Sequence, residues 1–218
     1  MIKFANKAWM SSMVLTATVL AAPNMATGAE QARNLSGFTA VHAGGSTDVE
    51  VTVGKPFSVV VSGDEDMLEY ITTEVRGGAL HIGREDGRRH RNSHGRLRVL
   101  VSMPSVDALA SSGSGDLWAT GINTDGNLDL DLRGSGDMGV SGKAATCDVD
   151  TRGSGDLEGE ELACGKTSIK SKGSGDIELT VNGEVSISSN GSGDIDLSGN
   201  ARIVELRSRG SGDISIEN

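Results

Sequence analysis

Apolar and polar positions alternate through residues 109–216, in phase with a repeated tetrapeptide. The sequence Gly-Ser-Gly-Asp starts at residues 113, 134, 153, 173, 191 and 210, so the intervals are 21, 19, 20, 18 and 19 residues. The residue four places before each motif is aliphatic: Leu109, Leu130, Val149, Ile169, Ile187 and Leu206. The residue after each Asp is aliphatic too: Leu117, Met138, Leu157, Ile177, Ile195 and Ile214. Period-two alternation on both sides of a Gly-rich motif predicts two strands joined by a tight corner.

A unit of about 20 residues cannot bury its apolar face alone, but stacked units can. We therefore predict an all-β fold, a right-handed parallel β-helix in which equivalent residues form inward ladders about 4.8 Å apart. A further inward ladder is expected six places before the motif, from Leu128 and Cys147 to Val204. Glycine is expected to supply the positive φ angles of each corner. The predicted structural residues of the corners are Gly113, Asp116, Gly134, Asp137, Gly153, Asp156, Gly173, Asp176, Gly191, Asp194, Gly210 and Asp213.

Residues 36–108 lack the tetrapeptide but contain short apolar runs, among them residues 49–53, 57–61 and 97–101. We interpret them as irregular early coils and an N-terminal cap, with one helical turn at residues 67–73. Together with the regular coils of residues 109–218 they form a single predicted domain, residues 30–218. The Arg- and His-rich residues 84–98 are expected to be a charged loop, with binding of an anionic surface polymer as the alternative.

The first 29 residues have the pattern of a secretory signal peptide. Lys3 and Lys7 precede an apolar run over residues 8–22, and small residues end at Ala29. The run is shorter than the roughly 20 residues that span a membrane, and no later segment is long and apolar enough to do so. We therefore expect cleavage near Ala29 and an exported protein, periplasmic or at the cell surface.

Composition and charge narrow the classes further. The chain has 31 Gly but only 3 Phe, 2 Trp and 1 Tyr, and no aromatic residue follows Trp118. This favours a thin core of aliphatic ladders over a conventional globular core. The net charge of 20 − 30 = −10 argues against a nucleic-acid partner, which requires a basic face.

Several segments in this order resemble one known family. They are Phe38, Val51-Thr-Val-Gly-Lys55, Val59-Val-Val-Ser-Gly-Asp64, Leu80-His-Ile-Gly83, Met103-Pro-Ser105 and then the serial tetrapeptide. The combination is similar to the DUF2807 proteins, the autotransporter adhesin, head GIN domain family, over about residues 36–217. The resemblance implies a bacterial exported β-helix without an established biochemical activity.

The repeated Asp has three interpretations. A carboxylate can accept backbone N–H bonds inside its own corner; the row could bind calcium, as Gly-rich repeats of β-rolls do; or it could be catalytic. On the outward face, Asp129, Asp131, Asp148 and Asp150 are expected to form a two-by-two block. Arg133 and Arg152 flank this block and can offset its charge. A weak divalent-cation site, with Ca²⁺ as the cofactor, or a glycan-cleaving site are the alternatives.

Cys147 and Cys164 are 17 residues apart, nearly one coil. An exported protein permits a disulfide, but the two residues lie at different offsets from their corners, which argues against suitable geometry. The alternative is a small apolar Cys147 in the core. Their spacing excludes a Cys-x-x-Cys zinc site.

These observations favour a non-enzymatic, adhesin-like binding or structural module of the cell envelope. Its partner would be an envelope or surface polymer or a protein, and an end-on homodimer is expected from the last coil. One alternative is a polysaccharide-active β-helix enzyme, which needs an aromatic platform beside an acid and a base; Trp118 is the single aromatic residue available in the repeat region. A passive envelope protein without ligand is the other alternative.

Overall fold

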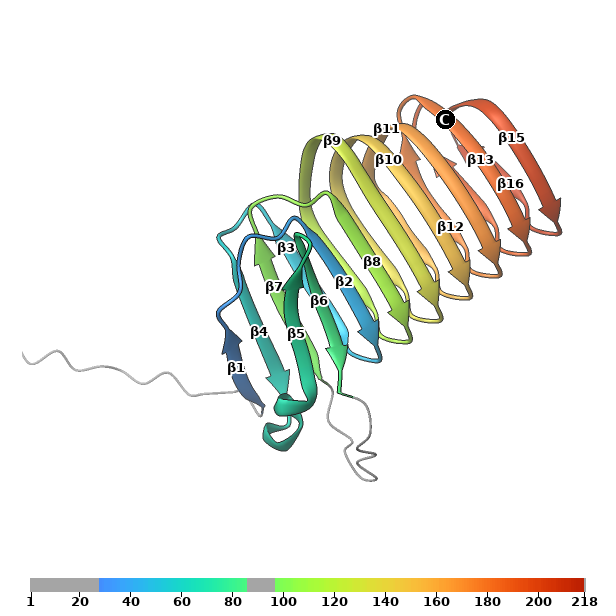
Figure 1. The fold of residues 1–218 in the computed structure, drawn as a ribbon. Coiled ribbons are helices and arrows are strands. Elements are labelled where there is room, and N and C mark those ends of the chain that lie inside the picture. Colours follow the sequence, from blue (N-terminus) through green and yellow to red (C-terminus); the bar gives the residue numbers. More distant parts are fainter. Residues whose placement is uncertain (1–27, 86–96, 218) are drawn as a thin grey trace, which may run out of the picture.

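The computed structural model describes residues 28–85 and 97–217 of the chain. The protein is 72% strand and 3% helix, and it contains a β-solenoid of about six turns with coils of about 20 residues. Figure 1 shows these coils stacked side by side from β8 to the C-terminal strands. The predicted fold class is thereby confirmed. The signal-peptide prediction concerns residues that lie almost wholly outside the described ones.

Each coil contributes one strand segment to each of two sheets, which the tetrapeptide corner joins. β9, β10 and β11 are long because each continues through the opposite turn from the second sheet of one coil into the first sheet of the next. The strands of the repeat region are β8 (Ala108–Gly113), β9 (Leu117–Gly134), β10 (Met138–Gly153), β11 (Leu157–Gly173), β12 (Ile177–Val181), β13 (Glu184–Gly191), β14 (Ile195–Ser198), β15 (Arg202–Gly210) and β16 (Ile214–Glu217).

The inward ladders have the predicted register. Leu109 pairs with Leu130, and the row continues through Val149, Ile169 and Ile187 to Leu206. All members are buried except Leu206 in the last coil, which is 50% exposed. One expected position is wrong. Ile203 pairs with Val185, and Val204 occupies a register shift, where it is 46% exposed.

Each corner requires glycine for two separate reasons. The first glycine adopts a left-handed backbone, as at Gly153 with φ +135°, which a side chain disfavours. The third residue, as at Gly155, does not, yet a Cβ there would lie 2.0 Å from the carbonyl oxygen of Gly136 in the preceding coil. Stacked corners therefore touch through their backbones.

The corner aspartates bond between coils and not within their own corners, so the expected capping geometry is wrong. The Oδ1 atom of Asp116 accepts the backbone N–H of Asp137 at 3.0 Å, and Asp137 accepts that of Asp156 at 2.9 Å. The series continues to Asp176, Asp194 and Asp213 at 2.7–2.8 Å. Stacking places each carboxylate over the next corner, where its own backbone has no free N–H to offer it. The result is a ladder of hydrogen bonds along the solenoid.

Another corner of this type lies in the N-terminal region. Gly45 pairs with Gly113, and the Oδ1 atom of Asp48 accepts the N–H of Asp116 at 3.4 Å. The four residues read Gly-Ser-Thr-Asp, with Thr47 in place of the third glycine. The tetrapeptide pattern did not reveal this corner, because the substitution breaks the exact match.

The other N-terminal strands extend both sheets. β2 (Ala40–Gly45) and β3 (Asp48–Val53) form a coil stacked on β8 and β9, and β6 (Ala79–Arg84) and β7 (Arg98–Met103) pair with its other side in parallel. Antiparallel strands follow outward: β5 (Ile71–Arg76) on β6, β4 (Ser58–Gly63) on β7, and β1 (Ala29–Arg33) on β4.

The expected helical turn is a 3₁₀ helix, η1 (Glu65–Tyr70). It ends three residues earlier than expected, because Ile71 already pairs with Arg84 in the β5–β6 ladder. Of the charged loop at residues 84–98, residues 86–96 lie outside the described residues, and its role remains a prediction.

Cys147 and Cys164 form a disulfide between neighbouring coils, with Cα atoms 5.9 Å apart. Cys164 pairs with Ala144, before the opposite turn, whereas Cys147 pairs with Thr167, after it. Because the chain bends between these two rows, both side chains point into the core and meet. The offset along the sequence, which argued against a bond, is taken up by this bend.

Candidate functional site

The outward side of the first sheet is the largest regular array of polar groups that the structure describes. The strand segment before each corner alternates inward and outward residues, so three side chains per coil project from it. Neighbouring segments are paired in register, about 4.8 Å apart. We call this array, from β9 to β15, the polar face. Its residues are Asp129, Asp131, Arg133, Asp148, Asp150, Arg152, Ser168, Lys170, Lys172, Ser186, Ser188, Asn190, Glu205, Arg207 and Arg209.

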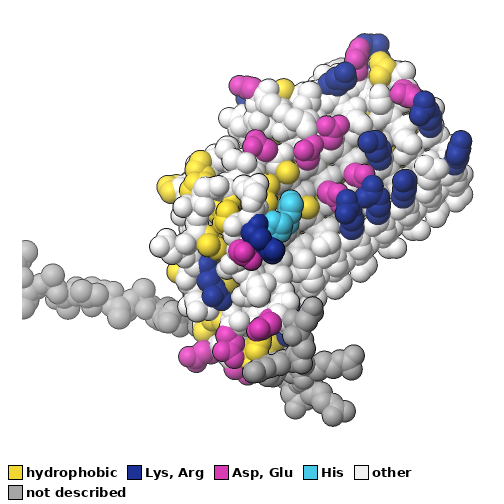
Figure 2. All heavy atoms as spheres, viewed as in Figure 1, with side chains coloured by type: hydrophobic (Ala, Val, Ile, Leu, Met, Phe, Trp, Pro, Cys, Tyr) yellow, Lys and Arg dark blue, Asp and Glu magenta, His cyan; other side chains and the backbone are white. Residues whose placement is uncertain are grey.

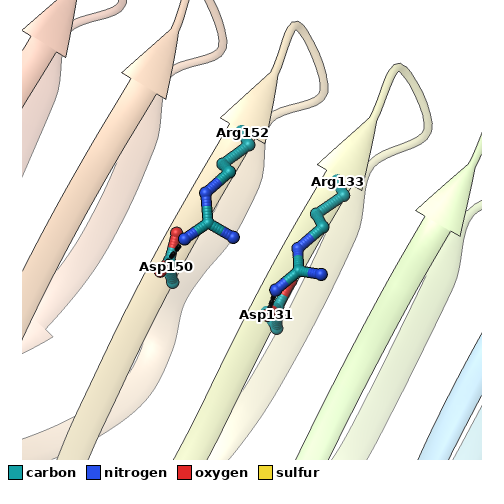
Figure 3. Close-up of polar contacts among 4 residues, drawn as sticks. All are labelled: Asp131, Arg133, Asp150 and Arg152. Carbon is teal, nitrogen blue, oxygen red and sulfur yellow. Dashed lines mark hydrogen bonds and ion pairs between the residues drawn. The ribbon is translucent and has the colours of Figure 1, made fainter.

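The four expected aspartates do lie together on β9 and β10. Asp129 is paired with Asp148, and Asp131 with Asp150. The Arg133 side chain donates to Asp131 at 2.5 Å and Arg152 donates to Asp150 at 2.7 Å, as Figure 3 shows. Both partners of each pair come from one strand, two residues apart.

These ion pairs bear on the calcium hypothesis. Asp129 accepts a hydrogen bond from the Asn127 amide at 2.6 Å, and two of the other carboxylates are held by arginine. Within residues 28–85 and 97–217, no group of three or more His, Cys, Asp or Glu side chains is arranged to hold a metal ion. The flanking cations thus provide the neutralisation that the sequence analysis considered, and the block offers no metal centre.

Positive charge dominates the polar face beyond β10. Arg133, Arg152 and Lys172 are paired in successive strands, followed by Asn190 and then Arg209. We call these cations, with Lys170, the basic column. Among the described residues, Lys170, Lys172 and Arg209 form no ion pair, whereas Arg207 is paired with Glu205 at 2.7 Å. Figure 2 shows Lys and Arg side chains gathered over this end of the face.

A shallow hollow of about 350 Å³ lies within the basic column. The small side chains of Ser186 and Ser188 lie between β11, which carries Lys170 and Lys172, and β15, which carries Arg207. Like charges on adjacent strands are destabilising, so the arrangement of Arg152 beside Lys172 disfavours the free protein. Such an arrangement can accept anionic groups.

At the N-terminal end of the same sheet, His42 and His81 contact each other edge to face, with ring centroids 4.7 Å apart. They line a hollow of about 500 Å³ with Asp131 and Arg133 on its other side. Burial and the neighbouring His81 lower the pKa of His42, while Asp131 opposes the shift. The pair was not expected from sequence, because the two histidines are 39 residues apart and meet through β2–β6 pairing.

The second sheet carries a different hollow, of about 320 Å³, on its outward side. Trp118 is 41% exposed and lies over Gly139, where a Cβ would come within 2.0 Å of its ring carbons. Glu158, Glu160, Glu161 and Glu178 line the same hollow. Burial, followed by repulsion from Glu160 and Glu158, raises the pKa of Glu178. Sequence analysis noted Trp118 but not these partners, which come from β11 and β12.

The stacked coils, the hydrogen-bonded aspartate ladder and the flat charged faces define a protein of the β-solenoid class. The polar face offers binding groups at fixed spacing on a rigid support. The chain belongs to the DUF2807 family, described as "Putative auto-transporter adhesin, head GIN domain", whose model matches residues 37–201.

Solved structures show the same fold. A putative adhesin from Bacteroides fragilis has a TM-score of 0.66 at 20% sequence identity, covering 87% of this chain and 96% of that one. A putative adhesin from Parabacteroides merdae has a TM-score of 0.49 at 17% identity, covering 89% and 98%. A putative lipid binding protein from Parabacteroides distasonis has a TM-score of 0.47 at 21% identity, also covering 89% and 98%. No protein with a curated description matches the chain.

Proposed function

We propose that this protein is an exported, non-enzymatic, adhesin-like binding module of the bacterial cell envelope. Membership of an adhesin-like family supports a place at the envelope or cell surface. The signal-peptide pattern of residues 1–29 supports export. In the described part of the chain, no helix has the length and apolar character needed to cross a membrane.

The observation that carries the proposal is the polar face. Its side chains stand on strands whose register is held by continuous pairing and by the aspartate ladder. A disulfide also joins two of the coils. Groups held at a fixed spacing lose little freedom on binding a ligand with a matching repeat, so a rigid face favours affinity. Linear polymers of the envelope or of another cell surface have such repeats.

The test is binding of the purified protein to an array of envelope and surface glycans, and to intact cells. We expect selective binding to a subset of the glycans, with loss of binding when residues of the polar face are substituted. Absence of binding to any glycan or cell would contradict the proposal and favour a passive envelope protein. Cell fractionation with an antibody checks the localisation, and a cytoplasmic protein would contradict it.

The Trp118 hollow favours a second candidate, a polysaccharide-active enzyme. An exposed indole can support a sugar ring, and a pair of carboxylates can cleave a glycosidic bond when one of them has a raised pKa and donates a proton. Glu178 has a raised pKa beside Glu158 and Glu160. Incubation with acidic and neutral polysaccharides, followed by an assay for new reducing ends, separates the candidates. Cleavage that Glu178→Gln abolishes would establish the enzyme; no cleavage leaves the binding module.

A further inference from the structure

We propose that the basic column binds a linear acidic polysaccharide, one that carries a carboxylate or sulfate group on its repeating unit. The polymer would lie across the strands, parallel to the solenoid axis. This inference rests on the proposed binding function and names its ligand class. It is drawn from the arrangement of charge on β10 to β15.

The first argument is direction. From Arg133 to Arg209 the column crosses four strand spacings of ~4.8 Å, or about 19 Å, along the solenoid axis. Arg133, Arg152 and Lys172 follow one another at consecutive spacings. A chain of anionic units laid along this axis meets a cation at nearly every strand, whereas a chain laid along a strand meets one or two.

The second argument is that part of the positive charge is unpaired. The acidic residues of the face neutralise Arg133, Arg152 and Arg207. Lys170, Lys172 and Arg209 have no carboxylate partner within the described residues, and all three are exposed. An anionic ligand supplies the missing partners and relieves the repulsion between adjacent cations.

The third argument favours a sugar polymer over a nucleic acid. Ser186, Ser188 and Asn190 line the hollow between the cationic strands and offer hydroxyl and amide groups to sugar hydroxyls. None of the hollow's lining residues is aromatic, so nothing there can stack on a base. The carboxylates of Asp150 and Glu205 beside the column, and the net charge of −10, oppose a ligand as densely charged as a nucleic acid.

The test compares the affinity of the purified protein for four fluorescently labelled probes: polygalacturonate, dextran sulfate, unsubstituted dextran and a DNA duplex. We expect binding to polygalacturonate or dextran sulfate that weakens steeply as salt increases, and none to dextran. In a series of galacturonate oligomers, affinity should rise with length and level off once the oligomer spans the column. Equal binding of dextran, or tighter binding of DNA, would overturn the inference.

The decisive variant is Lys170→Ser/Lys172→Ser/Arg209→Ser, in which the three unpaired cations are removed. We expect its affinity for the acidic polymer to fall at least about tenfold. The matched control, Lys55→Ser/Lys143→Ser/Lys166→Ser, removes the same charge from exposed lysines outside the face and should retain affinity. Both variants must melt like the parent protein, and these exposed sites make that the expected result.

The outcomes separate this inference from the proposed function. If the control weakens binding as much as the decisive variant, the attraction is general and the column is not the site. If the array finds a neutral glycan that both variants retain, the binding module stands and the basic column is excluded. If no probe and no array glycan binds, both proposals fail.

Discussion

At the scale of single residues, each corner aspartate stabilises the neighbouring coil. Its carboxylate accepts the backbone N–H of the next aspartate in the stack, five times from Asp116 to Asp213. The repeated acids therefore form one structural series, and the catalytic interpretation loses its basis, because their environments are alike. The unusual chemistry lies elsewhere, at the His42–His81 contact and at Glu178.

Asp156→Ala tests the ladder, because it leaves the N–H of Asp176 without its acceptor. We expect a loss of about 1 kcal/mol in the free energy of unfolding, measured by urea denaturation. Asp156→Asn retains an acceptor oxygen and should recover most of the loss. Asp213→Ala is the control, since no described backbone N–H depends on its carboxylate, and an equal loss there would contradict the ladder.

Gly155→Ala tests backbone contact between corners. The new methyl group would lie 2.0 Å from the Gly136 carbonyl oxygen, so neighbouring coils must separate. We expect a loss of about 1–3 kcal/mol in the free energy of unfolding, the range typical of overpacking. Gly126→Ala, whose nearest neighbour is a Thr124 hydroxyl at 3.4 Å, should cost much less; similar melting temperatures of the two variants would disprove the argument.

The lowered pKa of His42 predicts a pH dependence of stability. Its ordinary pKa is 6.5, and burial with His81 nearby lowers it in the folded protein. The unfolded chain therefore takes up the proton first, and stability falls as the pH drops below 6.5 towards the folded pKa. We expect the melting temperature to decline from about pH 7.5 to 5.5, and His42→Gln to reduce this slope. An unchanged slope in the variant would exclude His42 as the cause.

At the scale of elements, the corners keep strict register while the opposite turns absorb variation. Pairing is continuous from Cys147 to Gly153 on both neighbours of β10, whereas register shifts lie between Val140 and Gly142 and between Ala144 and Thr146. This explains how motif intervals of 18 to 21 residues fit one stack. The variable length bulges at the turn without disturbing the aspartate ladder.

The disulfide is predicted to stabilise the middle of the stack. It closes a sequence separation of 17 residues between two coils, and a loop of this size corresponds to about 3 kcal/mol of unfolding free energy. Cys147→Ala/Cys164→Ala should lower stability by that order, and the parent protein should show the same loss in reducing agent. If reducing agent lowers the double variant equally, the loss has another origin.

At the scale of the whole molecule, coils that are neighbours in space are not always neighbours in sequence. β2 and β3 stack on β8 and β9, although about 60 residues separate them, and β6 and β7 lie on their other side. The N-terminal coils therefore close only after the chain has returned past them. The other end is open in the described residues, where β15 pairs only with β13 and β16 only with β14.

The open end predicts end-on self-association. Val204 and Leu206 are 46% and 50% exposed there, and an unpaired strand edge can pair with another strand. We expect a concentration-dependent dimer by light scattering, and a monomer for Leu206→Lys with an unchanged circular dichroism spectrum. Ile216→Pro, which removes a backbone donor from β16, should act in the same direction. A monomeric parent protein at high concentration would refute the interface.

The sequence by itself determined the coil, the inward ladders and the outward rows, because each is a local pattern of period two repeated at a nearly constant interval. The positions of Leu109, Leu130 and Val149 follow from that pattern alone, and so does the clustering of the four aspartates.

The tertiary structure decided what depends on contact between coils. The direction of the aspartate bonds, the meeting of His42 with His81, the degenerate corner at Gly45–Asp48 and the Trp118 hollow all join residues from different coils. A repeat shows that coils stack, but the hydrogen bonds and hollows between them arise only once the register of every neighbouring pair is set.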